Sequence, residues 1–129
     1  LAVIFVLLNF SIDAKLQGVS VTGTLSCNKY RQRNQKVELM ERDVGLVDPD
    51  DLLAEVHSDH EGEFKLTGAT FEIGKIEPYI RVTHNCAAKP GCTRVTEFDI
   101  PKEYINGTTY VMDYVVLDIV QKRDKETCK

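Results

Sequence analysis

A run of cations around one aromatic residue is the part of the chain whose chemistry best suits an anionic partner. It spans residues 28–36 and contains Lys29, Tyr30, Arg31, Arg33 and Lys36. Each Lys or Arg close to a negatively charged membrane contributes about 1 kcal/mol of attraction, and a tyrosine ring is amphipathic. The run therefore predicts an exposed segment that contacts lipid headgroups. A solvated hairpin end with no ligand is the alternative.

Three histidines could act as bases or metal ligands. His57 and His60 flank Ser58 and Asp59, but a tight turn ending at Gly62 explains this segment, and zinc sites usually have more ligands. His84 lies two residues before Cys86, and a disulfide-bonded cysteine would offer no thiolate. We therefore expect no catalytic residue, metal or cofactor here.

An acidic group offers the carboxylate oxygens that calcium prefers. It consists of Asp43, Asp48, Asp50 and Asp51. Its spacing does not match an EF-hand loop, and the segment also contains turn-forming Gly45 and Pro49. The pattern favours a solvated acidic loop.

Asn106, Gly107 and Thr108 form an Asn-x-Thr sequence. In a secreted protein this is an acceptor for an N-linked glycan on an exposed turn. Asn-Gly also favours a turn before a strand, and the two interpretations are compatible.

Four cysteines predict two disulfides if the chain is secreted. They are Cys27, Cys86, Cys92 and Cys128, and three pairings are possible. We expect Cys86–Cys92, which closes a small loop, and Cys27–Cys128, which ties the first strand to the tail.

The N-terminal segment is typical of a secretory signal. Residues 1–10 are apolar, and Ala14 follows as a small residue at a plausible cleavage point. The run is shorter than the roughly 20 apolar residues of a transmembrane helix. We therefore predict a partial signal at 1–14 and one domain at 15–129, free outside the cell.

The charge balance is mildly acidic. The formal net charge is −4 at pH 7 for the 129 residues. This argues against general nucleic-acid binding, which usually needs a basic domain.

Short alternating runs with many β-branched residues predict the elements that position these groups. They fall at 19–27, 37–42, 52–57, 63–68, 71–73, 79–84, 93–100 and 109–120. The 52–57 and 63–68 runs suggest an antiparallel hairpin. The last run suggests a strand buried on more than one face, followed by a charged tail at 121–129. Seven to eight strands without helical periodicity predict an all-β, antiparallel sandwich.

Several segments together resemble the nematode transthyretin-like family. They are residues 21–27 (VTGTLSC), 48–53 (DPDDLL), 59–64 (DHEGEF), 84–86 (HNC) and 98–101 (FDIP). The resemblance covers nearly the whole chain after the signal. It implies a secreted, disulfide-bonded transthyretin-like (prealbumin-like) sandwich of two four-stranded sheets.

The resemblance also implies functions. One is a non-enzymatic adaptor that bridges exposed phosphatidylserine to a phagocyte receptor, with the cationic run at the headgroups. The alternative is a carrier of small apolar ligands in a transthyretin-like oligomer. Hydrolases of the wider superfamily end in Tyr-Arg-Gly-Ser, whereas this chain ends in Glu126, Thr127, Cys128 and Lys129. We therefore expect no enzyme.

Overall fold

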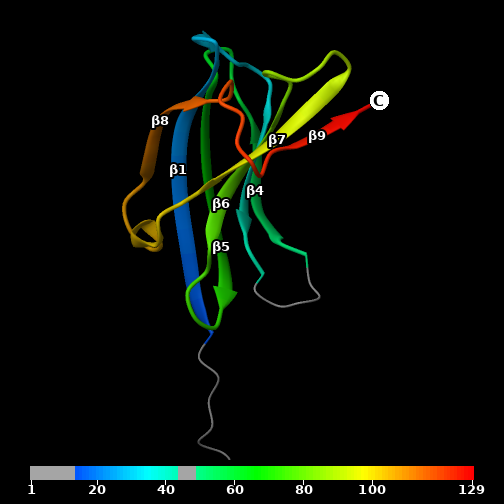
Figure 1. Ribbon diagram of the computed structural model, residues 1–129. Helices are drawn as coiled ribbons and strands as arrows, with labels where there is room; N and C mark the ends of the chain where they lie inside the picture. Colours follow the sequence, from blue (N-terminus) through cyan, green and yellow to red (C-terminus); the bar gives the residue numbers. More distant parts are fainter. Residues whose placement is uncertain (1–13, 44–48) are drawn as a thin grey trace, which may run out of the picture.

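The computed structural model describes residues 14–43 and 49–129 and shows a sandwich of two β-sheets (Figure 1). The expected signal therefore lies outside the described residues except for Ala14, and Asp48 lies outside them too. The elements are β1 (Lys15–Cys27), β2 (Tyr30–Arg31), β3 (Lys36–Glu41), β4 (Asp51–His57), β5 (Glu63–Glu72), β6 (Pro78–His84), β7 (Cys92–Asp99), the 3₁₀ turn η1 (Lys102–Tyr104), β8 (Tyr110–Val116) and β9 (Lys125–Cys128).

The first sheet is built on β1, the longest strand. β5 and the short β2 pair with β1 antiparallel, whereas β8 pairs with it in parallel. The alternating sequence of β1 gives the strand one face toward the core and one toward the outside. Val19, Val21 and Leu25 are buried, while Ser20 and Thr22 lie on the outer side. The predicted sandwich is thus confirmed, with one parallel pair inside it.

The second sheet has the order β4-β3-β6-β7-β9 and is antiparallel throughout the described residues. Its inner face contributes Leu39, Ile80 and Val82, which are fully buried against the first sheet. β9 makes this sheet five-stranded, so one of the two four-stranded sheets implied by the resemblance has an added strand.

The predicted hairpin between 52–57 and 63–68 is wrong. β4 pairs with β3 in one sheet, and β5 pairs with β1 in the other. The turn between them crosses the sandwich, held by the Asp59 carboxylate, which accepts from the amides of Glu61 (2.9 Å) and Glu63 (2.8 Å). Alternation identifies a strand but does not choose its partner.

β5 also runs on through Gly68, joining the two strands expected at 63–68 and 71–73. A Cβ at Gly68 would lie 2.9 Å from the Leu53 Cβ. Glycine is thus required here by the close approach of β4 to β5.

β8 is an edge strand with an exposed outer face, so the expectation that it is buried on more than one face is wrong. Val111 and Tyr114 are each 59% exposed, and Val115 alone is buried within the strand. Among the described residues no strand pairs with its outer edge. The register shifts opposite Thr22 and Thr24, where Asp113 adopts a left-handed φ of 57° and forms a bulge.

The predicted disulfide pairing is also wrong. Cys27 bonds to Cys86, and Cys92 bonds to Cys128. The expected charged tail forms β9, whose register on β7 places Cys128 directly opposite Cys92, with Cα atoms 4.0 Å apart. Cys86 follows β6 at the same end of the sandwich as the end of β1, so Cys27 and Cys86 join the two sheets. Sequence spacing could not show these neighbours, because they depend on strand order.

A buried polar network lies beside the Cys27–Cys86 bond. Arg94 donates to the carbonyls of Cys86 (2.6 Å) and Leu117 (3.0 Å) and pairs with the buried carboxylate of Asp124. His84 accepts the Cys86 amide at Nδ1 (3.0 Å), so Nε2 carries the proton and donates to Thr96 Oγ1 (2.9 Å). Burial, aided by the Arg94 charge, lowers the pKa of His84 to about 4.

Candidate functional site

The cationic run forms a very tight turn at the end of β1. Cys27 pairs with Tyr30 and Ser26 with Arg31, leaving two residues in the turn. Asn28 and Lys29 both have left-handed φ values, 49° and 72°, as a type I′ turn requires. Asparagine tolerates this conformation, but for lysine it costs about 1–2 kcal/mol relative to an ordinary conformation. The turn thus holds a cation where glycine would fit more easily.

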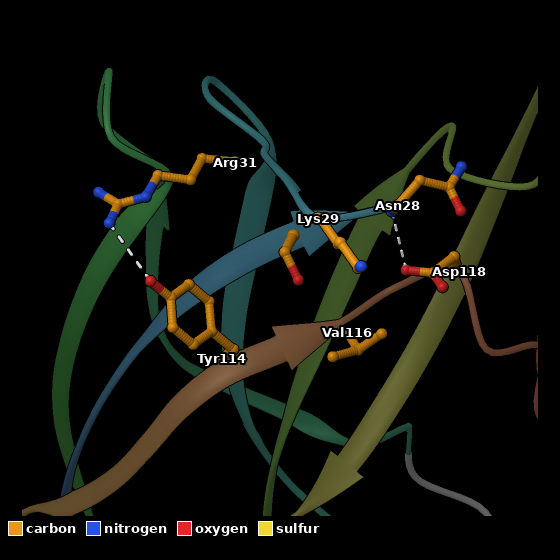
Figure 2. A pocket seen from close by; sticks show the side chains of 7 residues that line it. Asn28, Lys29, Arg31, Tyr114, Val116 and Asp118 are labelled. Atoms are coloured by element: carbon orange, nitrogen blue, oxygen red, sulfur yellow. Dashed lines mark hydrogen bonds between the residues drawn. The ribbon is translucent and has the colours of Figure 1, made fainter.

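A hollow of about 630 Å³ lies between this turn and β8 (Figure 2). It is lined by Ser26, Asn28, Lys29, Arg31, Tyr114, Val116 and Asp118. The outward side chains of β8 form an apolar wall, and Lys29 reaches in from the opposite side.

Both signs of charge border the hollow. Arg31 donates to the Tyr114 hydroxyl (3.3 Å) and lies 3.9 Å from the Glu61 carboxylate. On the other side, Asp118 Oδ1 accepts from the Asn28 amide (3.0 Å). A ligand held here would meet two cations and a carboxylate together.

The structure separates the five predicted ligand-binding residues. Lys29 and Arg31 share the hollow, and Tyr30 is 76% exposed at the turn. Arg33 instead lies 3.4 Å from His60 Nδ1, and Lys36 begins β3 between β4 and β6.

Sequence reasoning missed Tyr114, Val116 and Asp118. The alternation within 110–116 could have placed the first two on one outer face. It could not have shown that β8 lies beside β1 at the cationic turn. No sequence signal indicates Asp118.

Asn106 is exposed, but its side chain is engaged. Its Oδ1 accepts from the Gly18 amide (2.8 Å), and its Nδ2 donates to the Leu16 carbonyl (3.2 Å). The segment after η1 is thereby fastened to β1. Glycosylation of Asn106 stays a prediction.

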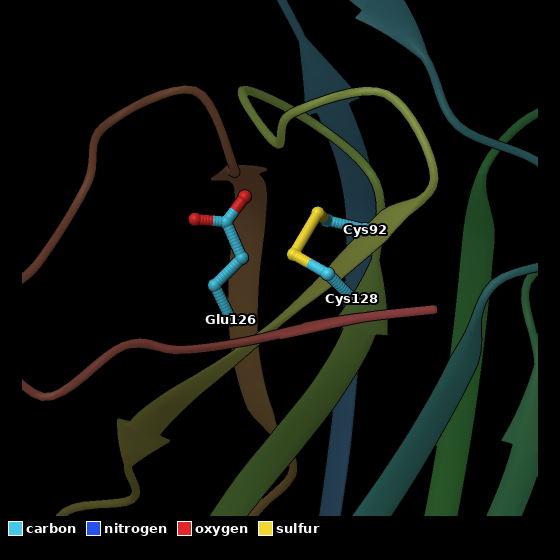
Figure 3. Close-up of side chains that lie close together, drawn as sticks. All are labelled: Cys92, Glu126 and Cys128. Carbon is cyan, nitrogen blue, oxygen red and sulfur yellow. A yellow bond between two sulfur atoms is a disulfide. The ribbon is translucent and has the colours of Figure 1, made fainter.

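One group of potential metal ligands lies at β7 and β9 (Figure 3), where Cys92, Glu126 and Cys128 come within 4.8 Å of one another. The two sulfurs are bonded to each other, and the Glu126 carboxylate accepts from the Lys89 amide (2.9 Å). Without a thiolate this group does not suit a metal.

Comparison with known proteins decides the family. The model of the transthyretin-like family matches residues 22–101. The chain belongs to the transthyretin-like family. Transthyretin-like protein 16 of Caenorhabditis elegans is 44% identical over 117 residues, which cover 90% of this chain and 86% of that protein. Transthyretin-like protein 2 of the same organism is 38% identical, covering 88% and 82% respectively.

Members of the family are generally extracellular and are not known as enzymes. Among the described residues no helix is long and apolar enough to cross a membrane. A solved structure, the 9R-lipoxygenase from Cyanothece PCC8801, aligns at TM-score 0.49 and 21% identity over 78% of this chain and 16% of its own. That level of similarity indicates neither a shared fold nor a shared activity.

Proposed function

We propose that this transthyretin-like chain is a secreted, non-enzymatic binding protein that holds phosphatidylserine-bearing surfaces at its cationic turn and links them to a cell-surface receptor. One observation carries the proposal. Lys29, Arg31 and Asp118 surround a single hollow beside an exposed tyrosine.

The headgroup of phosphatidylserine matches this arrangement of charges. It carries a phosphate, a carboxylate and an ammonium group. Lys29 and Arg31 supply donors for the two anions, and charge-assisted hydrogen bonds of this kind are about twice as strong as neutral ones. Asp118 supplies an acceptor for the ammonium group. An anionic lipid without an amine would leave Asp118 unmatched.

Tyr30 and the wall of the hollow suit the depth just below the headgroups. Tyrosine favours the boundary between lipid and water, since its ring is apolar and its hydroxyl is polar. Tyr30 follows Lys29 at the exposed turn, outside the lining of the hollow, where its ring is free to enter this boundary.

The test is binding of the disulfide-bonded protein to vesicles with and without phosphatidylserine, at low and moderate salt. We expect binding that needs phosphatidylserine and weakens as salt screens the charges. The Lys29→Ser, Arg31→Ser double variant should lose it. The control is Arg33→Ser, Lys36→Ser, which removes the same charge outside the hollow and should keep it. Absence of wild-type binding, or equal loss in both variants, contradicts the proposal.

Asp118→Asn tests the match to the amine. It should reduce the preference for phosphatidylserine over phosphatidylglycerol, which is anionic but has no amine.

The receptor side is tested by capture of phosphatidylserine-coated beads by phagocytes, which should increase with added protein.

A second candidate is a carrier of small apolar ligands in an oligomer. It is favoured by the outward row of Val111, Tyr114 and Val116 along β8. Binding of an apolar fluorescent dye should then be insensitive to salt and be lost in Val111→Ser, Val116→Ser. Salt-sensitive vesicle binding without dye binding rejects this candidate.

A further inference from the structure

Three carboxylates meet at the end of the sandwich opposite the cationic turn. Glu41 ends β3, Asp51 begins β4 as its register partner, and Glu72 ends β5 in the other sheet. Their side-chain oxygens all lie within 4.8 Å of one another. The cluster therefore spans both sheets at the point where the core ends.

Glu41 is the centre of this cluster and is buried. Its exposed fraction is 5%, and its Oε2 has no hydrogen-bond partner. A buried carboxylate oxygen without a partner loses its hydration and gains nothing in return. Burial, together with the charges of Glu72, Asp51 and Asp43, raises the pKa of Glu41 to about 7. The position is thus unfavourable for a lone carboxylate.

The cations near Glu41 do not neutralise its buried carboxylate. Arg42, the next residue, pairs with Asp99 (2.7 Å) and Glu97 (3.5 Å) and stacks over the Tyr79 ring at 4.1 Å. Lys102 lies 3.8 Å from Glu77. Lys75 and Lys102 line a hollow of about 250 Å³ with Glu41 and Glu72, yet among the described residues the three clustered carboxylates form no ion pair.

We propose that Glu41, Asp51 and Glu72 bind a calcium ion that joins the two sheets at this end. Calcium takes carboxylate oxygens at about 2.3–2.6 Å, so its ligands lie up to about 5 Å apart, which the cluster satisfies. The ion would give the buried Oε2 of Glu41 its partner, and water would complete the coordination. Sites in extracellular modules commonly have dissociation constants on the order of 10⁻⁴–10⁻³ M, which suits three carboxylates.

The test is thermal unfolding of the disulfide-bonded protein in chelator and in about 10 mM CaCl₂, with ionic strength matched by NaCl. We expect calcium to raise Tm by roughly 5–10 °C. Magnesium should have a smaller effect, because it needs near-ideal octahedral geometry. Titration calorimetry should give one site.

Glu41→Gln and Glu72→Gln should each abolish the calcium shift. Glu55→Gln, the same substitution at an exposed position of β4, is the matched control and should keep it. Glu41→Gln should not lower Tm in chelator, because it replaces a disfavoured buried charge with a neutral group of the same shape. Loss of the shift in this variant would then not reflect misfolding.

Two outcomes overturn the proposal. One is a wild-type Tm that does not respond to calcium. The other is a shift that persists in Glu41→Gln, which would place the ion on exposed acids elsewhere. Both are independent of vesicle binding, since the cationic turn lies at the other end of the molecule.

Discussion

The end with the cationic turn (the cationic end) and the end with the Glu41 cluster (the acidic end) hold their charged groups in different ways. At one end Lys29, Tyr30 and Arg31 project from a two-residue turn. At the other, Glu41 is buried against Asp51 and Glu72. The cationic end places Lys29 in an unfavourable backbone conformation, whereas the acidic end places Glu41 in an unfavourable electrostatic environment.

This difference shows that two charged side chains in one small sandwich can have very different effects on its stability. Lys29 is exposed, so its charge keeps water around it and adds little to the free energy of folding. A buried glutamate adds a great deal, because it loses water.

The strongest perturbation is removal of the bond that anchors the cationic end. Cys27→Ala with Cys86→Ala should lower the free energy of unfolding by roughly 2–5 kcal/mol, measured by urea denaturation. Removing Cys92–Cys128 should cost less in the chain-entropy model, because the sequence separation is 36 rather than 59. A larger loss for Cys92–Cys128 would contradict this order.

Acid should weaken the cationic end through His84. Its pKa is about 4 in the folded chain and 6.5 ordinarily, so the unfolded chain binds the proton first as pH falls. The free energy of unfolding should therefore fall between about pH 6.5 and 4, by up to about 3 kcal/mol. His84→Asn keeps an acceptor for the Cys86 amide and should flatten this acid limb. An unchanged limb would assign it to another group.

The acidic end should respond to pH in the opposite direction. The pKa of Glu41 is raised from 4.5 to about 7, so stability falls as pH rises through that window. In chelator at pH 8, Glu41→Gln should be more stable than the wild type by about 2 kcal/mol. Thermal unfolding at pH 4 and pH 8 measures the difference, which should nearly vanish at pH 4.

Lys29→Gly separates backbone strain from charge at the turn. Asn-Gly is the preferred pair for a type I′ turn, so stability should rise by up to about 1 kcal/mol. Binding to phosphatidylserine vesicles should weaken at the same time. A stabilised variant with full binding would remove Lys29 from the site.

Glu61→Gln is the mildest change. Glu61 and Arg31 form an exposed pair at 3.9 Å, so the unfolding midpoint should not measurably change. Vesicle binding should strengthen by about two- to fivefold, because one repulsive charge beside Arg31 is gone. Weaker binding would mean that Glu61 positions Arg31.

The two ends also differ in how well the sequence predicts them. Lys29 to Lys36 are adjacent in the chain, so their charge was visible from the sequence. Glu41, Asp51 and Glu72 come from three strands, and each alone resembles an ordinary surface acid. The sequence indicated the acidic group Asp43, Asp48, Asp50 and Asp51, of which only Asp51 belongs to this cluster.

The same reason explains the errors in the fold. The periodicity of two shows which residues face the core, and it correctly identified most strands. It does not show which strands are neighbours, so it missed the crossing after His57 and the pairing of the two predicted disulfides. The length and β-branched content of 109–120 predict a strand buried on more than one face, whereas the structure leaves the outer face of β8 open.

The bulge at Asp113 affects the tendency of this protein to aggregate at high concentration. A straight, uncovered edge strand is a template on which other chains add strands, which leads to aggregation. β8 is apolar and lacks a neighbour on its outer side among the described residues, yet it is interrupted by a charged residue in a left-handed conformation. The bulge prevents another chain from pairing continuously along β8. Molecules crowded on a surface should therefore resist amyloid-like growth.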